Sequence, residues 1–256
     1  MTNPIIFYSN LLETATVTAS SVEAGFPVTN LYDRRRYTYY KPGASADFTV
    51  NIDFGAATTT TAISILGHNL GTETALFQLK TASAATMSGS TTLLSQAFTS
   101  DLDYLTTWAS AGKQYYQISI TGLNDSSLYI GQIFLGNHLE MQRQLQDGYD
   151  KDARKTEGQV VISEGGQFLG ASYKYISRDV SAEFRYLTQA WVTSYLDDFL
   201  NNYYLKLKPF IFVADYDNYP TDVLWLRAAD NPSRSMPSAG PIYRHWTLTA
   251  TGVDTQ

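Results

Sequence analysis

Alternation of hydrophobic and polar residues predicts short β-strands throughout the first half of the chain. The clearest run, residues 48–54, places four apolar side chains on one face and Thr, Asn and Asp on the other. Gly55 is expected to end this strand. Further strands are predicted at residues 61–67, 75–81, 115–120 and 128–136. Short strands with turn residues between them, and no sustained helical period, indicate an antiparallel β-sandwich over residues 1–138.

The second half begins with a polar, charge-dense stretch. Residues 139–157 are interpreted as a connector between domains, or else as an extended arm that becomes ordered against a neighbouring subunit. Residues 158–256 are expected to form a β-rich α+β domain. Its strands are predicted at residues 158–163, 171–176, 178–186, 210–214, 222–227 and 243–251. The chain is therefore predicted to be mainly β, with two domains.

One amphipathic helix is predicted at about residues 188–204. Apolar residues recur there at helical spacing, and Thr188 is a suitable N-cap. The expected buried stripe consists of Leu187, Trp191, Tyr195, Leu196, Phe199, Leu200 and Tyr203. Lys208 and Pro209 are expected to end the helix before the next strand.

Composition narrows the classes of function. Hydrophobic residues make up 44% of the chain, enough for packed cores, but charged residues only 16%, against about 25% in ordinary globular proteins. The net charge of −6 disfavours nucleic acid as a partner, because phosphates are bound by an excess of Lys and Arg. Cysteine is absent, which excludes disulfides and thiolate metal sites. No secretory leader or membrane span is expected.

No catalytic constellation is recognisable. The three histidines, His68, His138 and His245, have no close partners in sequence and are interpreted as structural. Acidic clusters at Asp147, Asp150 and Asp152, at Asp215, Asp217 and Asp222, and at Asp197 and Asp198 are interpreted as solvated loops, turns or a helix face. The chain is therefore expected to be neither an enzyme nor a holder of metals or cofactors.

Two segments remain as candidates for recognition. The first combines cations with aromatic rings: Arg34, Arg35, Arg36, Tyr37, Tyr39 and Tyr40. Such a cluster suits a subunit interface or a glycan contact, and it can also be a surface whose charges are locally compensated. The second is the proline-rich loop 230–241, which is either a docking loop or a plain surface connection.

The first half resembles a discoidin-type, galactose-binding-like jelly roll. The resemblance is carried by residues 30–33 (Asn-Leu-Tyr-Asp), 51–55 (Asn-Ile-Asp-Phe-Gly), 63–70 (ending Gly-His-Asn-Leu) and 130–136. It covers about half of the chain. Such modules also occur in virion proteins of tailed phages, where they serve as scaffolding and need not bind sugar.

The last third resembles minor-tail and tail-tip proteins of long-tailed bacteriophages. Residues 191–227 carry this resemblance through a helix, a Lys-Pro-Phe entry into a strand and a later Tyr-Pro-Thr, together with the closing strand 246–251. Those proteins build closed rings around the tail axis. No long hairpin of the kind that lines a tail tube is predicted here, which favours a terminal or adaptor position such as the distal tail.

These observations together predict a structural protein of a phage tail. It would assemble with itself into a homo-oligomeric ring, join the tube to tip or host-attachment proteins, and reside in the virion after assembly in the bacterial cytoplasm. The alternative is a carbohydrate-binding protein that recognises a host-surface glycan. A glycan-degrading enzyme is disfavoured, because paired acids across a cleft are not evident.

Overall fold

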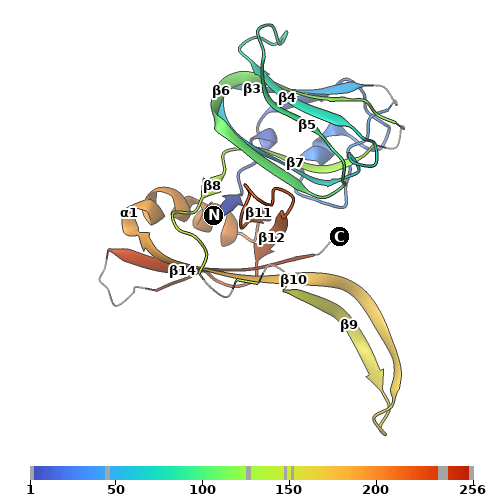
Figure 1. Cartoon of the computed structure of the whole chain (residues 1–256), viewed down its shortest axis with the longest axis vertical. Coiled ribbons are helices and arrows are strands. Elements are labelled where there is room, and N and C mark those ends of the chain that lie inside the picture. Colours follow the sequence, from blue (N-terminus) through green and yellow to red (C-terminus); the bar gives the residue numbers. More distant parts are fainter. Residues whose placement is uncertain are drawn as a thin grey trace. The chain divides into compact units, whose positions relative to one another are not determined.

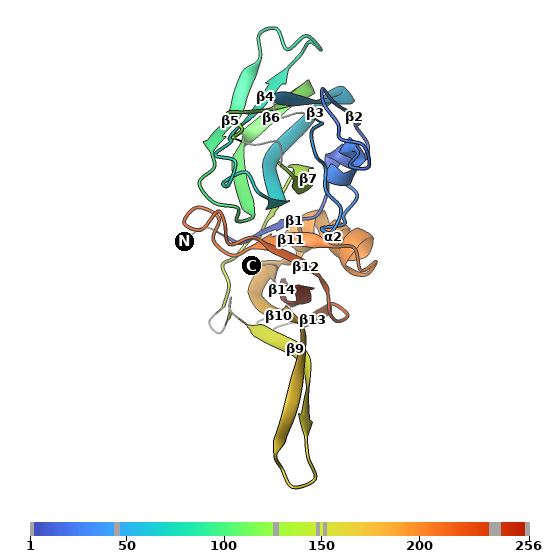
Figure 2. The same ribbon diagram turned by 90° about the vertical axis from the view of Figure 1, so that its right-hand side faces the viewer.

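The computed structural model describes residues 3–43, 47–124, 128–146, 149–150, 153–235 and 242–253. They form mainly antiparallel strands, as Figures 1 and 2 show. The chain divides into two compact units. The sandwich unit comprises Ser9–His138 and Asn218–Val223, and the arm unit comprises Met1–Tyr8, Leu139–Asp217 and Leu224–Gln256. The division thus differs from the predicted domains: residues 1–8 and the expected connector 139–157 belong to the arm unit.

The sandwich unit is an antiparallel β-structure. Its elements are η1 (Leu11–Glu13), β2 (Thr16–Ala19), η2 (Val28–Leu31), β3 (Phe48–His68), β4 (Leu76–Ala82), β5 (Thr91–Ala97), β6 (Tyr104–Thr121) and β7 (Ile130–Gly136). The strands are ordered β2-β3-β6-β4-β5, with β7 also paired to β3. The predicted strands of this half are present, whereas β2 and β5 were not predicted.

Strand β3 joins the two sides of the sandwich. Its first half pairs with β2, and its second half, from Ala62 to His68, pairs with β7. Gly55 does not end the strand as predicted. It lies at φ +73°, where the register against β6 shifts between Asp53 and Thr58. A glycine at such an irregularity bends a strand without ending it.

The apolar face of β3 points into the core, as its alternation predicts. Phe48, Val50 and Ile52 are buried, while Asn51 between them is exposed. All seven residues of β7 are buried. The core also contains Leu31, Ile63, Ile65, Phe77, Leu79, Tyr116, Ile118, Ile120 and Ile133.

The arm unit is built on an eight-stranded antiparallel sheet. Its strands are β1 (Ile5–Phe7), β8 (Leu139–Glu140), β9 (Arg154–Ile162), β10 (Phe168–Thr188), β11 (Phe210–Val213), β12 (Leu224–Ala228), β13 (Ser233–Ser235) and β14 (Tyr243–Val253). Their order is β8-β1-β11-β12-β14-β10-β9, with β13 beside β14. The N-terminal strand β1 lies inside this sheet, between β8 and β11.

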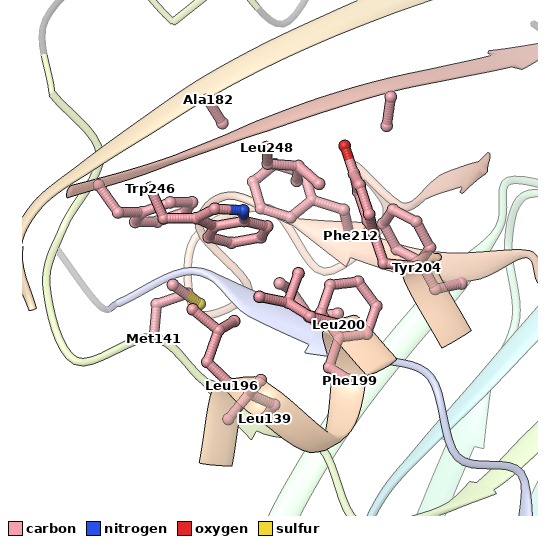
Figure 3. Packing of buried hydrophobic residues seen from close by; sticks show 14 of the residues in the cluster. Leu139, Met141, Ala182, Leu196, Phe199, Leu200, Tyr204, Phe212, Trp246 and Leu248 are labelled. Atoms are coloured by element: carbon pink, nitrogen blue, oxygen red, sulfur yellow. The ribbon is translucent and has the colours of Figure 1, made fainter. Parts of the chain in front are cut away.

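The predicted helix packs against this sheet. Figure 3 shows Leu196, Phe199 and Tyr204 meeting Trp246 and other core side chains. The Trp246 ring lies edge-on to Phe199 and Tyr204, with centroids 6.2 and 6.3 Å away. Thr188 caps the helix as predicted, because its hydroxyl accepts a hydrogen bond from the Trp191 N–H.

The helix is not a regular α-helix. Turns α1 (Gln189–Trp191) and α2 (Asp197–Phe199) alternate with the π-helical segments η3 (Val192–Leu196) and η4 (Leu200–Tyr204). Hydrogen bonds from residue i to i+5 lower the rotation per residue, so four-residue steps bring Val192, Leu196, Leu200 and Tyr204 to the core. The prediction that Tyr195 lies in the buried stripe is wrong, since its side chain is 56% exposed.

Strands β9 and β10 form a long hairpin, so the expectation that the chain has no long hairpin is wrong. Residues 178–188 of β10 pair with β14, but residues 168–176 pair with β9 alone. Figures 1 and 2 show this part extending beyond the rest of the arm unit's sheet. The predicted break between strands 171–176 and 178–186 is absent. Ser177 at that point lies within β10, and its hydroxyl donates to the Lys155 carbonyl.

The alternating helix yields a stability prediction. Replacing Leu196 by Ala should lower the free energy of unfolding of the arm unit by about 2–5 kcal/mol, because it opens a cavity in a closed core. Replacing Tyr195 by Ala should change it by less than about 1 kcal/mol. Urea unfolding followed by tryptophan fluorescence measures both. Equal losses in the two variants would contradict the π-helical assignment of the buried face.

Candidate functional site

The cation-rich segment from Arg34 to Tyr40 is organised by a buried glutamine of β7. The Gln132 side chain is fully buried and bonds at both of its polar atoms. Its oxygen accepts from the Arg34 N–H, and its nitrogen donates to Asp33 and to the carbonyls of Asn30 and Arg35. Asp33 in turn accepts from the Arg35 N–H. This amide therefore fixes the loop that presents the arginines.

Two of the three arginines are engaged within the sandwich unit. Arg34 pairs with Glu13 and lies over the Phe134 ring, 5.4 Å from its centroid. Arg36 pairs with Asp103 at 2.9 Å, and Asp103 also accepts from the Gly67 N–H. These ion pairs agree with the alternative in which the charges of this surface are compensated locally. A bound anion would have to compete with a carboxylate at each of them.

Tyr40 belongs to the core. Its side chain is fully buried, its ring contacts Phe48, and its backbone pairs with Ile130. The hydroxyl donates to the Ser21 carbonyl. A surface contact through this ring is therefore not available, and its role is to anchor the end of the loop.

Arg35, Tyr37 and Tyr39 remain displayed to solvent. The side chain of Tyr37 is 74% exposed, that of Tyr39 is 37% exposed, and Arg35 is exposed as well. The Tyr39 ring lies 5.2 Å from the Tyr129 ring at a tilt of 59°. We name these four residues the tyrosine surface. A planar cation beside aromatic rings is suited to sugar rings and to protein side chains alike.

The second candidate surface is the hairpin of the arm unit. We define the arm as residues 154–176, none of which is buried. It nonetheless carries seven large hydrophobic side chains that are 46–68% exposed. They are Val160, Val161, Ile162, Phe168, Leu169, Tyr173 and Tyr175. Strand β9 forms the last position of the sheet order, so its outer edge has no partner strand among the described residues.

The three histidines occupy structural positions. His68 ends β3 and is buried against Phe98, where its Nδ1 accepts from the Leu70 N–H at 3.2 Å. Burial lowers the pKa of His68 to about 4. His138 lies 2.9 Å from the Thr61 hydroxyl, and the His245 ring contacts Tyr186.

The acidic residues form no recognisable centre. Asp198 accepts from the Tyr8 hydroxyl and from Asn202, so it holds the helix to β1. Asp147, Asp152 and residues 236–241 of the proline-rich loop lie outside the described residues. In the part of the chain that the structure describes, no three His, Asp or Glu side chains gather as metal ligands, and no helix is long and apolar enough to span a membrane.

Sequence reasoning missed the residues that decide this site. Gln132, Glu13 and Asp103 lie 21 to 98 residues from the arginines that they contact. The only available signal was the polar Gln132 inside an otherwise apolar strand of residues 130–135. A polar residue in such a run is buried with its hydrogen bonds satisfied.

Comparison with known proteins gives likenesses of structure only. No family model matches the chain, and no curated protein matches its sequence. Similar solved structures include a chitosan-binding module of a chitosanase/glucanase from Paenibacillus sp. IK-5 (TM-score 0.44, 17% identity, 50% of this chain and 98% of the module). Another is the family 32 carbohydrate-binding module of NanJ from Clostridium perfringens, in complex with galactose (TM-score 0.43, 12% identity, 53% and 99%).

A third, CpGH89CBM32-5 from Clostridium perfringens, was solved with GalNAc-β-1,3-galactose (TM-score 0.43, 9% identity, 50% and 99%). TM-scores below 0.5 and identities below 20% give no ground for transferring these ligands to the present chain.

The buried histidine predicts a pH dependence. Between pH 6.5 and about 4 the unfolded chain protonates His68 while the folded chain does not, so stability should fall as the pH falls through this window. The full loss should be on the order of 3 kcal/mol. His68→Asn keeps an acceptor for the Leu70 N–H but removes the titration. Chemical unfolding at pH 5 and pH 7 should show a smaller difference in this variant; an undiminished difference would assign the effect to other groups.

Proposed function

We propose that this chain is a non-catalytic assembly protein, a subunit that joins copies of itself through the arm. The observation that carries the proposal is the arm itself: a two-stranded hairpin that exposes seven large hydrophobic side chains and whose β9 edge is unpaired within the described sheet. An isolated two-stranded hairpin is marginally stable in water. Packing against another chain supplies the burial that the hairpin lacks.

The scarcity of charged residues along most of the arm favours a close contact with another protein chain. Between Gly158 and Tyr173 the only charged residue is Glu164. Free edge strands of soluble proteins are usually protected by charges, prolines or short length. The nine-residue strand β9 has charged residues only in its first four positions, Arg154 to Glu157. An apolar edge of this kind suits pairing with a strand of a neighbouring copy.

A head-to-tail contact through one arm leads to a ring. The arm of one subunit would meet a different surface of the next, and such heterologous contacts generate rings when the rotation closes. We propose a ring in the tail of a bacteriophage, at the distal tail or tail tip, where the subunit joins the tube to tip proteins. The hairpin of β9 and β10 removes the reason for preferring a terminal position to the tube, so the choice of the distal tail rests on resemblance alone. The resemblance of the last third of the chain to tail proteins supports this placement.

A second candidate function is recognition of a host-surface glycan by the sandwich unit. The specific observation in its favour is the tyrosine surface, where the Tyr39 and Tyr129 rings are in contact and the same loop exposes Tyr37 and Arg35. Exposed aromatic rings with a nearby donor fork offer stacking and hydrogen bonds together. The tyrosine surface belongs to the sandwich unit and the arm to the arm unit, so the two functions use different residues.

The assembly proposal predicts a change in mass. Replacing both Ile162 and Phe168 by Lys should shift the protein from a defined oligomer toward monomer, because it places charges where the apolar contact forms. Light scattering over a range of concentrations measures this. Leu205→Lys is the control, since it charges a residue of the arm unit that is 50% exposed but lies outside the arm. A wild-type chain that stays monomeric at every concentration would contradict self-assembly.

The glycan candidate predicts a different phenotype. Tyr37→Ala and Arg35→Ala should each weaken binding to a responsive glycan by roughly two- to tenfold, the range of single aromatic or cation contacts. Surface plasmon resonance on immobilised host polysaccharide measures the loss. Tyr219→Ala, at another exposed tyrosine of the same unit, should leave binding unchanged. Equal binding by all variants would remove the tyrosine surface as the site.

A further inference from the structure

A groove in the arm unit lies beside an irregularity of β10. It has a volume of about 700 Å³, within the usual size range of ligand sites. Its lining residues are Asn3, Gln142, Arg143, Gln144, Leu145, Gln146, Arg185, Tyr186 and Tyr243. Four of these are carboxamides, two are arginines, two are tyrosines, and none is acidic. Neither the assembly proposal nor the tyrosine surface uses this groove.

A β-bulge directs two side chains of β10 toward the groove. Phe184 pairs with Trp246 and Leu187 with Arg244, so Arg185 and Tyr186 together oppose the single residue His245. Phe184 and Leu187 are buried, whereas both bulge residues are exposed. A regular strand would turn one of the two inward. The bulge thus places a guanidinium and a phenol side by side on the outer face.

Tyr186 adopts a conformation that bulky residues rarely take. Its φ is +59°, in the left-handed region that disfavours a side chain. The ring is held edge-on to Tyr243, with centroids 6.1 Å apart, and to His245 at 5.2 Å. Backbone strain of this kind is concentrated at functional sites, where the surrounding structure maintains it.

The opposite wall is fixed to β10 on both sides of the bulge. The Gln142 side chain accepts from the Thr188 N–H and donates to the Thr188 hydroxyl, at 2.7 and 3.0 Å. The Gln146 N–H donates to the Glu183 carbonyl at 3.1 Å. The groove is therefore held open by hydrogen bonds between its walls, which lowers the cost of ordering it on binding.

The chemistry of the lining selects the class of ligand. Carboxamides both donate and accept hydrogen bonds, as sugar hydroxyls do, and tyrosine rings offer faces for stacking. Arg185 binds Glu183 through Nε and Nη2, so its charge is largely compensated. Among the described residues that line the groove, Leu145 is the only aliphatic one, which disfavours an apolar peptide or lipid. We propose that this groove binds an oligosaccharide that is neutral or carries a single acidic sugar near Arg143.

The test uses the full chain on a glycan microarray of neutral and uronate- or sialate-bearing oligosaccharides of three to six sugars. The array member with the highest signal is then titrated by calorimetry. The critical variant is Tyr186→Gly, because glycine accepts a φ of +59° without strain and the substitution removes the whole Tyr186 side chain. Its thermal unfolding midpoint should equal or exceed that of the wild type, while its affinity should fall at least tenfold. Tyr186→Phe should retain most of the affinity.

The matched control is the double variant Arg35→Ala, Tyr37→Ala in the sandwich unit. Its affinity should equal that of the wild type if the groove is the site. Binding that survives Tyr186→Gly but is lost in this double variant would overturn the proposal and assign the saccharide to the tyrosine surface. The absence of any binding on the array would overturn it too. Neither result bears on assembly through the arm, which light scattering measures separately.

Discussion

The pairing of β1 with β8 and β11 is the contact on which the architecture depends. Ile5 and Ile6 oppose Glu140 and Leu139 on one side, and Val213 and Phe212 on the other. The chain leaves the arm unit after Tyr8 and returns at Leu139, so the sandwich unit, apart from its short segment Asn218–Val223, is an insertion between two neighbouring strands. Pairing β1 with β8 closes a loop of about 130 residues and costs conformational entropy. An insertion that folds first brings its two ends together and thereby lowers this cost. Asn10 contributes to this, because its buried amide bonds to Ile133 and Leu135 and holds the two ends of the insertion together.

Strand pairing between distant segments also limits how much of the fold could be predicted from the sequence. Alternation correctly indicated strands wherever one face is buried, as in the first half of β3. It indicated two separate strands around Ser177 because the arm buries neither face and therefore leaves no periodic pattern. The pairing of β1 across 130 residues has no local signal at all. The helix was placed correctly, but π-helical turns shifted its buried face, and the apolar spacing that predicts a helix does not distinguish these turns from α-helical ones.

The candidate site was predictable in composition but not in geometry. The cluster from Arg34 to Tyr40 contains the cations and rings that recognition needs, and Tyr37 and Tyr39 are indeed displayed. Whether an arginine is displayed or internally paired depends on partners that only the fold brings near, such as Glu13 and Asp103. The groove beside β10 was unpredictable for a related reason. The groove exists because β10 has one residue more than β14 between two paired positions. This bulge turns Arg185 and Tyr186 to the same face.

The exposed apolar side chains of the arm have different surroundings from the rings of the groove and of the tyrosine surface. This difference distinguishes a surface suited to self-assembly from surfaces suited to ligand recognition. The arm exposes apolar side chains next to the unpaired backbone edge of β9. Another strand would both complete the backbone hydrogen bonds of this edge and bury the apolar side chains. In the groove, aromatic rings lie among amides and guanidinium groups, and the tyrosine surface combines exposed rings with an exposed arginine. A polar ligand with hydroxyl groups satisfies that environment better than a strand does. The proposed uses agree with the local composition, since charge would oppose strand pairing on the arm, and carboxamides outnumber charged residues around the groove.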